Sequence, residues 1–352
     1  MISEPFTAER EKNMLSFVND YCEGAHPEIL RRLGENNFKK MPGYGEDEFC
    51  ASAAEKIRSA CGKPEAKVYF LTGGTQTNSV VIDSVLKPFQ GVISAVSGHI
   101  NAHESGAVEA CGHKILQLPH HNGKLCADEV RKLCADFYAD EAHDHMVFPG
   151  MVYISHPTEY GTLYTLDELK ALRAVCDEYS MKLFLDGARL GYGLAAGEVT
   201  MNDIAQLCNV FYIGGTKVGA LFGEAVVFAD GDAPEHFITL YKRRGAMLAK
   251  GWLTGLQFDT LFTDGLYMKI SQNAIDCAAR IKAALKAKGY KFLIDSPTNQ
   301  IFVIMENEAV AKLREKVGCE IWERPDDRHT AIRFVTSWAT PASDVDELIK
   351  LL

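Results

Sequence analysis

The stretch FYIGGTKVGALFGEAVVF, residues Phe211–Phe228, places a single lysine between two apolar segments that are typical of buried β-strands. Lysine is almost never fully buried without a partner, so the position of Lys217 needs a chemical reason. The first segment ends in two glycines and a threonine. A lysine near such a strand end can be desolvated, so that its pKa falls and its amine becomes a nucleophile. A reactive amine is therefore one explanation for Lys217, and the polar groups at the other strand ends decide between the explanations.

The composition of the 352 residues is ordinary for a globular protein, with 47% apolar and 24% charged residues. The net charge of −10 argues against nucleic acid or an anionic membrane as a partner. The N-terminal MISEPFTAEREK lacks the apolar core of a secretory signal, and no apolar run has the length of a membrane span. The ten cysteines are scattered without a CxxC pair, which is typical of buried, reduced thiols. We therefore expect a cytoplasmic protein.

Short apolar runs alternate with helix-like segments from about residue 67 to residue 228. Seven of these runs predict strands: AKVYFLTGG, GVISAV, HKILQLP, GMVYIS, MKLFLDG, VFYIGG and EAVVF. TLDELKALRAVCDEYS predicts a helix between the fourth and fifth runs, because Thr165 and Glu168 form a capping box before an apolar repeat of helical spacing. The pattern predicts an α/β fold with a mostly parallel seven-stranded sheet and helices on both faces.

The pattern changes after Phe228. Residues 252–289 are predicted to be nearly all helical, with an apolar stripe formed by Ile270, Ala274, Cys277, Ile281 and Leu285. Strands are predicted near YKFLID, QIFVIM, CEIWE and AIRFVTSW, before a last helix from about Ser343. We expect a large α/β domain over residues 1–245, with an N-terminal arm over residues 1–20, and a smaller α+β domain over residues 246–352.

Three polar groups follow strands of the predicted sheet, at the edge where ligands bind in open α/β folds. Gly74 and Thr75 begin a predicted helix and suit a phosphate, although the same sequence is also typical of a tight turn that binds no ligand. Asp186 forms either a structural pair with Arg189 or a carboxylate that holds a proton on a heteroaromatic nitrogen. Together with Lys217, these groups match the requirements of pyridoxal phosphate.

Other ligand classes lack their usual motifs. No GxxxxGK[ST] loop is present and no GxGxxG follows a strand, which argues against a nucleotide-dependent oxidoreductase. His143 and His145 lie in a polar, acidic segment, where exposed histidines are commoner than metal ligands. We therefore predict no metal site.

Seven ordered motifs resemble the L-threonine aldolase and phenylserine aldolase family of fold-type I pyridoxal-phosphate enzymes. These motifs span nearly the whole chain: GYGEDE, LTGGTQTN, GHINAHESGA, PTEYGTLYTLDE, LFLDGARL, GGTKVG and IRFVTSWAT. TEYGTLYTLDE and RFVTSWAT are especially similar to the phenylserine-aldolase branch. The resemblance implies an aspartate-aminotransferase-like fold, pyridoxal 5'-phosphate as cofactor, and a homo-oligomer, dimer or tetramer, with sites at subunit interfaces.

The resemblance also implies which residues bind the cofactor. Lys217 holds it covalently, and Asp186 bonds the nitrogen of its ring. Gly74 and Thr75 hold its phosphate, and Arg189 lies near its phenolic oxygen. His99, in SGHINAHE, stacks on the ring face.

The substrate residues follow from the same resemblance. Arg333 binds the carboxylate through a bidentate pair, and Asn19 lies where the family often has a serine that assists it. Tyr44 lines the pocket of its own or a neighbouring subunit. His99 is our first candidate for the catalytic base, since its ordinary pKa suits the task. Glu159 is the second candidate, because it stands where many relatives have a histidine.

The implied activity is that of a carbon–carbon lyase. It cleaves L-threonine, L-allo-threonine or a related β-hydroxy-α-amino acid, phenylserine included, to glycine and an aldehyde. A β-eliminating lyase or an aminotransferase on the same fold is the alternative. A non-catalytic binding protein is disfavoured, because Lys217, Asp186 and Arg333 are all present.

Overall fold

A computed structural model describes residues 14–352. The first 13 residues of the predicted N-terminal arm, and the prediction that they form no secretory signal, lie outside it. The main sheet has seven strands in the order β2 (Lys67–Leu71), β8 (Glu224–Phe228), β7 (Val210–Gly214), β6 (Lys182–Asp186), β5 (Phe148–Ser155), β3 (Gln90–Ala95) and β4 (Ile115–Leu118). Strand β8 is antiparallel to both of its neighbours, and the other four pairs are parallel. The predicted mostly parallel seven-stranded sheet is confirmed.

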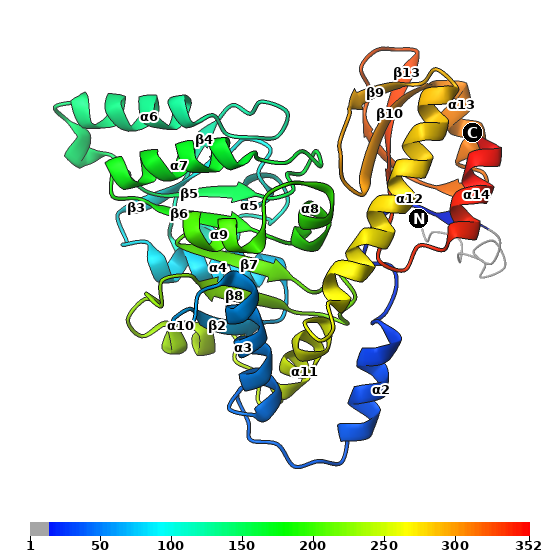
Figure 1. The fold of residues 1–352 in the computed structure, drawn as a ribbon. Helices are drawn as coiled ribbons and strands as arrows, with labels where there is room; N and C mark the ends of the chain where they lie inside the picture. The colour runs from blue at the N-terminus through cyan, green and yellow to red at the C-terminus, as the bar shows by residue number, and fades with distance from the viewer. Residues whose placement is uncertain (1–13) are drawn as a thin grey trace, which may run out of the picture.

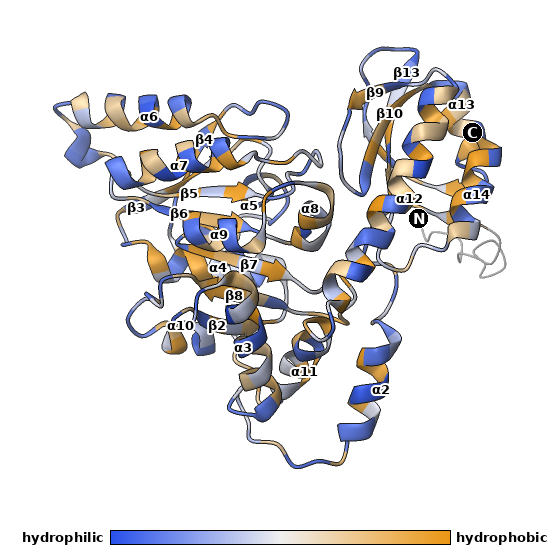
Figure 2. Cartoon of the chain, viewed as in Figure 1, coloured by the Kyte–Doolittle hydropathy of each residue, from blue (hydrophilic) through white to orange (hydrophobic). Residues whose placement is uncertain are grey.

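Helices cover both faces of this sheet (Figure 1). Along β6, Leu183 and Leu185 point into one core and Phe184 points into the other. The first core is shared with α3 (Glu48–Cys61), α6 (Ala127–Ala139), α7 (Leu166–Glu178) and α9 (Met201–Leu207). The second is shared with α4 (Gly74–Val85), α5 (His99–Ala102) and α10 (Phe237–Arg243). Because both faces are buried, the central strands are mostly apolar, as the orange on β7 and β8 in Figure 2 shows.

Helix α7 begins where the capping box predicts. The Thr165 hydroxyl accepts from the Glu168 N–H at 3.2 Å, and the Glu168 carboxylate accepts from the Thr165 N–H at 2.7 Å. This reciprocal pair satisfies two N–H groups that a helix start otherwise leaves free. The start of α7 is therefore determined by its local sequence.

The C-terminal part contains an antiparallel sheet in the order β12 (Glu320–Glu323), β13 (His329–Val335), β10 (Gln300–Glu306) and β9 (Lys291–Ile294). It packs with α12 (Leu266–Ala287), α13 (Asn307–Leu313) and α14 (Ala342–Leu351). The prediction that residues 252–289 are nearly all helical is confirmed, and the segment forms two helices, α11 (Trp252–Leu261) and α12. The chain turns between them at Asp264 and Gly265, whose φ angles of 51° and 68° are incompatible with a right-handed helix.

Helix α12 connects the two parts of the molecule (Figure 1). Its first turns and α11 pack in the core of the large sheet, through Phe258 and Tyr267 among others. Its later turns, with Ile281 and Leu285, pack in the C-terminal core, which also includes Phe17. The division at residues 245 and 246 stays a prediction, and the packing favours a division within α12.

The remaining elements connect or flank these parts. They are β1 (Leu15–Ser16), which pairs with β11 (Val317–Gly318), the helices α2 (Pro27–Asn36) and α8 (Leu190–Ala196), and the short 3-10 turns η1 (Glu109–Cys111) and η2 (His143–His145). None of the helices within residues 14–352 combines the length and the apolar character needed to cross a membrane. All ten cysteines are free thiols, but Cys22 is exposed, so the expectation that all of them are buried is wrong.

Candidate active site

A cavity of about 500 Å³ opens where β2, β5, β6 and β7 end and β8 begins. Antiparallel β8 starts at this edge because Glu224 pairs with Gly214 of β7 and with Leu71 of β2. Eight of the ten predicted site residues line the cavity: Gly74, Thr75, His99, Glu159, Asp186, Arg189, Lys217 and Arg333. Segments far apart in the sequence therefore meet at one edge of the sheet, as the strand-end argument predicts.

Asp186 is buried at the end of β6, and both of its carboxylate oxygens accept hydrogen bonds. The Tyr153 hydroxyl donates to Oδ2 at 2.6 Å and the Tyr212 hydroxyl to Oδ1 at 2.5 Å. Asn78 donates to Oδ2 at 3.0 Å. Burial alone would raise the pKa of Asp186, but His99 and these hydrogen bonds outweigh burial, so the pKa lies below its ordinary value. Asp186 is therefore a stable anion.

Lys217 lies in the turn that follows β7. Burial and the nearby Arg189 lower the pKa of its amine, and the carboxylates of Asp20, Asp186 and Glu224 oppose this only in part. The Lys217 carbonyl accepts from the Tyr192 hydroxyl at 2.5 Å, which fixes the backbone that carries the amine. A lowered pKa increases the neutral fraction of the amine, which is the nucleophilic form.

Glu224 holds the turn that carries Lys217. Its Oε1 accepts from the Thr216 hydroxyl at 2.7 Å, and its Oε2 accepts from the Gly215 N–H at 3.1 Å. The side chain is buried, which raises the pKa of Glu224 to about 8. This carboxyl group connects the start of β8 to the lysine turn.

His99 stands at the start of α5, beside two glutamates. Its Nδ1 lies 2.7 Å from Oε1 of the buried Glu104. Its backbone N–H donates to Oε1 of Glu159 at 2.9 Å, and the Ser155 hydroxyl donates to the same oxygen at 2.7 Å. Burial raises the pKa of Glu159, in spite of these bonds. The two candidate bases therefore lie side by side.

Arg189 pairs with Asp20 and not with Asp186, so the alternative of a structural Asp186–Arg189 pair is wrong. Its Nε donates to Oδ2 of Asp20 at 2.6 Å and its Nη2 donates to Oδ1 at 3.0 Å. Asn299 donates to the same Oδ2 at 2.9 Å. This bidentate pair anchors the N-terminal segment at the cavity and leaves Asp186 free of a guanidinium partner.

Arg333 enters the cavity from β13. Its Nη1 donates to Gln300 Oε1 at 2.8 Å, and its Nη2 forms an ion pair with the Glu320 carboxylate. Its guanidinium carbon lies 5.0 Å from the centre of the Trp322 ring. The buried Nε has no hydrogen-bond partner among residues 14–352. Arg333 is thus held in place, with its Nε donor unpaired in the described part of the chain.

The segment Gly73–Thr75 begins α4 at the same cavity. Gly73 is the N-cap, and it offers no side chain to the first N–H groups of this 12-residue helix. A Cβ atom on Gly74 would lie 3.2 Å from the Tyr212 hydroxyl, so a larger residue would crowd the group that bonds Asp186. Free N–H groups at the positive end of a helix dipole suit a phosphate.

Comparisons with known proteins identify the family. Residues 31–307 match the family model described as beta-eliminating lyase. This chain belongs to the beta-eliminating lyase family. A low specificity L-threonine aldolase of a Pseudomonas species is 29% identical over 338 residues, covering 94% of this chain and 95% of that protein. A Leishmania major threonine aldolase structure has a TM-score of 0.92 and 40% identity, covering 96% of this chain and 98% of that one.

More distant structures bear on the fold alone. A putative L-allo-threonine aldolase from Listeria monocytogenes has a TM-score of 0.74 at 18% identity, with 97% of this chain and 96% of that one covered. An aspartate aminotransferase from Thermus thermophilus has a TM-score of 0.68 at 14% identity, with 97% and 92% covered. The predicted aspartate-aminotransferase-like fold is confirmed.

Membership of the beta-eliminating lyase family confirms the predicted dependence on pyridoxal phosphate. The residues present fit this group. A phosphate suits the start of α4, a protonated ring nitrogen suits the anionic Asp186, and an aldehyde suits the Lys217 amine. The Arg333 guanidinium on the cavity wall suits a substrate carboxylate.

Two predicted residues lie outside this cavity. The Asn19 side chain accepts from the Tyr21 N–H at 3.0 Å, so it stabilises a local turn. Tyr44 is half exposed, and the Lys242 amine lies 4.2 Å from the centre of its ring. Neither residue lines the cavity within this one chain, and their roles stay predictions.

Sequence reasoning missed three buried carboxylates of the beta-eliminating lyase site. Asp20 is adjacent to Asn19, the residue that the resemblance implies at the substrate carboxylate. Glu104 closes the motif HINAHE, and Glu224 begins an apolar strand. The shared motif around Glu104 and the apolar run after Glu224 were the available signals, and Asp20 had no such signal.

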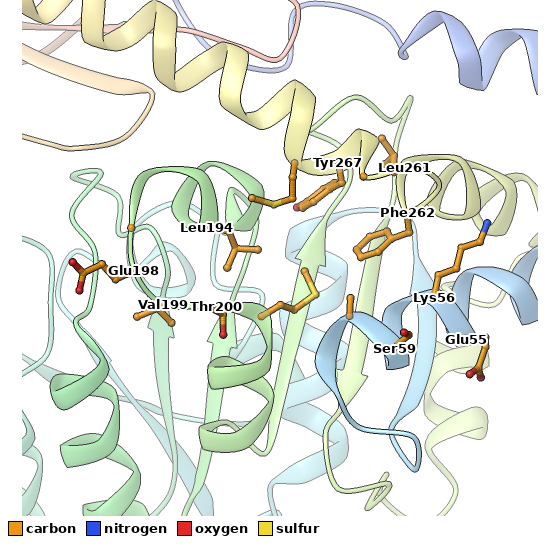
Figure 3. Close-up of a pocket in the computed structure, with 15 residues that line it drawn as sticks. Glu55, Lys56, Ser59, Leu194, Glu198, Val199, Thr200, Leu261, Phe262 and Tyr267 are labelled. Atoms are coloured by element: carbon orange, nitrogen blue, oxygen red, sulfur yellow. The ribbon is translucent and has the colours of Figure 1, made fainter.

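A second hollow, of about 710 Å³, lies between α3, the α8–α9 connection and the turn before α12. Figure 3 shows Leu194, Phe262 and Tyr267 around its centre and the charged end of Glu55 directed away from it. Most of the side chains that line this hollow are apolar, and it lacks the cluster of acids and bases that lines the first cavity. Within residues 14–352, no group of three or more His, Cys, Asp or Glu side chains could hold a metal ion.

Proposed function

We propose that this chain is a carbon–carbon lyase of the threonine aldolase type. It would cleave the Cα–Cβ bond of L-threonine, L-allo-threonine or a related β-hydroxy-α-amino acid, phenylserine included, to give glycine and an aldehyde. The convergence of Lys217, Asp186 and Arg333 on one cavity carries the proposal. The 40% identity to a protein described as a threonine aldolase favours this activity over the alternatives.

The residues on the sheet side bind the cofactor. Gly74 and Thr75 hold its phosphate, and Lys217 binds its aldehyde carbon. When bound, pyridoxal phosphate supplies an electron sink that accepts the electron pair of the breaking bond. The low pKa of Asp186 keeps its carboxylate ionised, so it holds the proton on the ring nitrogen.

The residues on the other side orient the substrate. Arg333 lines the cavity and binds the substrate carboxylate through its guanidinium group. Fixing the carboxylate and the amine sets the direction of the Cα–Cβ bond, and this alignment decides which bond breaks.

His99 takes the proton of the β-hydroxyl group. Its Nδ1 is engaged with Glu104, so Nε2 is the nitrogen that accepts this proton. Glu159 is the second candidate, because its Oε1 already accepts hydrogen bonds from the His99 N–H and the Ser155 hydroxyl. General base catalysis of this kind contributes about 100- to 10,000-fold in rate.

A panel assay tests the proposal. L-threonine, L-allo-threonine, phenylserine and serine are each supplied, and glycine and aldehyde are measured separately. Equal amounts of glycine and aldehyde support an aldolase. Ammonia with a keto acid indicates a β-eliminating lyase, and a keto acid formed only with an amino-group acceptor indicates an aminotransferase.

We also propose a cytoplasmic homo-oligomer, dimer or tetramer, without a nucleic-acid, membrane or metal partner. Tyr21 lines the cavity and is 54% exposed in the single chain, which is consistent with cover from a second subunit. Tyr44 would enter a neighbour's cavity in such an assembly, and Asn19 would assist Arg333.

A further inference from the structure

We propose that Glu104 is a positioning residue for His99, which holds the proton on Nδ1 and sets the strength of Nε2 as a base. The inference rests on the proposed function for the role of His99, and on the structure for the contact with Glu104. It also connects His99 to Asp186, through the amide of Asn78.

The contact is short and enclosed. Glu104 is 4% exposed, and its Oε1 lies 2.7 Å from His99 Nδ1. An ionised carboxylate only accepts hydrogen bonds, so the proton of this contact belongs to Nδ1. The other imidazole nitrogen, Nε2, is then unprotonated in the neutral ring. This is the nucleophile–base–orienter arrangement in which a third group fixes the tautomer of the base.

The backbone brings Glu104 back to His99. Helix α5 ends at Ala102, and its C-cap His103 has φ −133° and ψ 17°, so the chain leaves helical geometry just before Glu104. Glu104 follows His99 by only five positions, and the contact forms within this short segment. Glu104 therefore contacts His99 because of local geometry and not by long-range packing alone.

Asn78 extends the contact to the other side of the site. Its Nδ2 donates to Glu104 Oε1 at 2.8 Å and to Asp186 Oδ2 at 3.0 Å. Carboxylate oxygens accept hydrogen bonds, so the amide atom of Asn78 that faces both of them is the NH₂ nitrogen and not the oxygen. Glu104 Oε2 has no hydrogen-bond partner among residues 14–352. Two buried carboxylates thus share one amide, and a positive charge close to them is stabilised.

The charges that face His99 come from several elements. Burial lowers the pKa of His99, and Lys217 lowers it further. The hydrogen bond and charge of Glu104 and the charge of Asp186 raise it, and Glu159 binds the backbone of the same residue. The pKa of His99 lies above its ordinary value on balance. Removing the Glu104 charge should therefore lower this pKa.

The test compares Glu104→Gln with Glu109→Gln in the cofactor-loaded protein. Glutamine keeps an acceptor for Nδ1 but removes the charge, whereas Glu109 is an exposed acid five residues further along the chain. The pKa of His99 is measured by deuterium exchange at its imidazole C2 position, followed by mass spectrometry. The rate of aldehyde release is measured against pH in parallel.

We expect Glu104→Gln to lower the exchange midpoint of His99 by about one pH unit or more. The acid limb of kcat/KM should move to lower pH by the same amount, and the plateau rate should fall about tenfold because the base is weaker. Glu109→Gln should change neither quantity. A folded, loaded Glu104→Gln protein with an unchanged His99 midpoint would overturn the inference.

If Glu104→Gln does not fold, the exchange midpoint of His99 in the unmodified protein provides a second test. This midpoint should lie above that of free histidine, and a midpoint at or below that value would overturn the inference. The exchange measurement does not require aldol cleavage. A shifted His99 midpoint in a protein without aldolase activity would support the role of Glu104 and contradict the proposed function. An unshifted His99 midpoint in an active aldolase would contradict the role of Glu104 and support the proposed function.

Discussion

The guanidinium of Arg333 already has a carboxylate partner before any substrate arrives. Glu320 occupies its Nη2, with 42% of the Glu320 side chain exposed. An incoming substrate carboxylate competes with this partner for the same positive charge. We therefore expect Glu320 to weaken substrate binding, whereas Gln300 and Trp322 hold the arginine in place.

Glu320→Gln should lower KM for the amino-acid substrate about two- to fivefold and leave kcat unchanged, since partly exposed ion pairs contribute about 0.2–1 kcal/mol. Steady-state kinetics checks this, with Glu323→Gln on the same strand as the matched control. A higher KM in Glu320→Gln would show that the carboxylate positions Arg333 instead of competing with its ligand.

The site residues that could be predicted are those whose chemistry conflicts with their surroundings. Lys217 and Asp186 are charged groups at the ends of apolar strands, so the sequence alone marks them. Asp20 could not be found in this way, because its partner Arg189 lies 169 positions away. An ion pair between residues so far apart forms only in the folded chain, and the periodicity of apolar residues in the sequence does not predict it.

At the scale of elements, the turn between β7 and β8 depends on a buried acid. Burial raises the pKa of Glu224 from its ordinary 4.5 to about 8. Between these values the folded chain binds more protons at this group than the unfolded chain does. Its contribution to stability is therefore lost as the pH rises through this interval.

Glu224→Gln removes this dependence, because glutamine does not titrate. Relative to this variant, the unmodified protein should lose thermal stability as the pH rises from about 5 to about 8. The two proteins should also differ in melting temperature by a constant amount that does not depend on pH. Melting temperatures of both proteins across this range measure the effect. Parallel curves would show that Glu224 has an ordinary pKa in the folded chain.

Helices α3 and α11 approach closely at Gly255. A Cβ atom there would lie 2.6 Å from the backbone nitrogen of Cys50. Gly255→Ala should therefore cost about 1–3 kcal/mol of unfolding free energy, through overpacking. Gly34→Ala in α2 is the control, because nothing lies within 4 Å of its Cβ position. Denaturant titration should show destabilisation for Gly255 and a small gain, about 0.5–1 kcal/mol, for Gly34.

The elements themselves were largely predictable, since buried strands and capped helices leave local signals. The start of α7 follows from two residues, Thr165 and Glu168. The prediction that residues 252–289 are nearly all helical gives no position for the break between α11 and α12, which falls at Asp264 and Gly265. The domain division was harder, since α12 contributes side chains to two cores.

On the scale of the whole molecule, several large apolar side chains are exposed along the N-terminal segment. Tyr21, Leu30, Phe38 and Tyr44 are 54%, 50%, 94% and 48% exposed, respectively. Exposed apolar groups that gather on one segment are typical of an interface between subunits. This segment also contributes Tyr21 to the cavity.

Phe38→Glu should shift the protein toward a smaller assembly, because it places a charge on this surface. Light scattering after gel filtration measures the mass, with Phe89→Glu, which lies outside the segment and is 53% exposed, as the control. An unmodified protein that is monomeric at micromolar concentration would contradict the proposed assembly.

The central claim is that Lys217 binds the cofactor aldehyde opposite Asp186. The most direct measurement is borohydride reduction of the purified protein with pyridoxal phosphate, followed by digestion and mass spectrometry. We predict one modified peptide, which carries the reduced cofactor on Lys217, and its loss in Lys217→Ala together with the yellow absorbance. A modification on another lysine, or full aldehyde release by Lys217→Ala, would contradict the account.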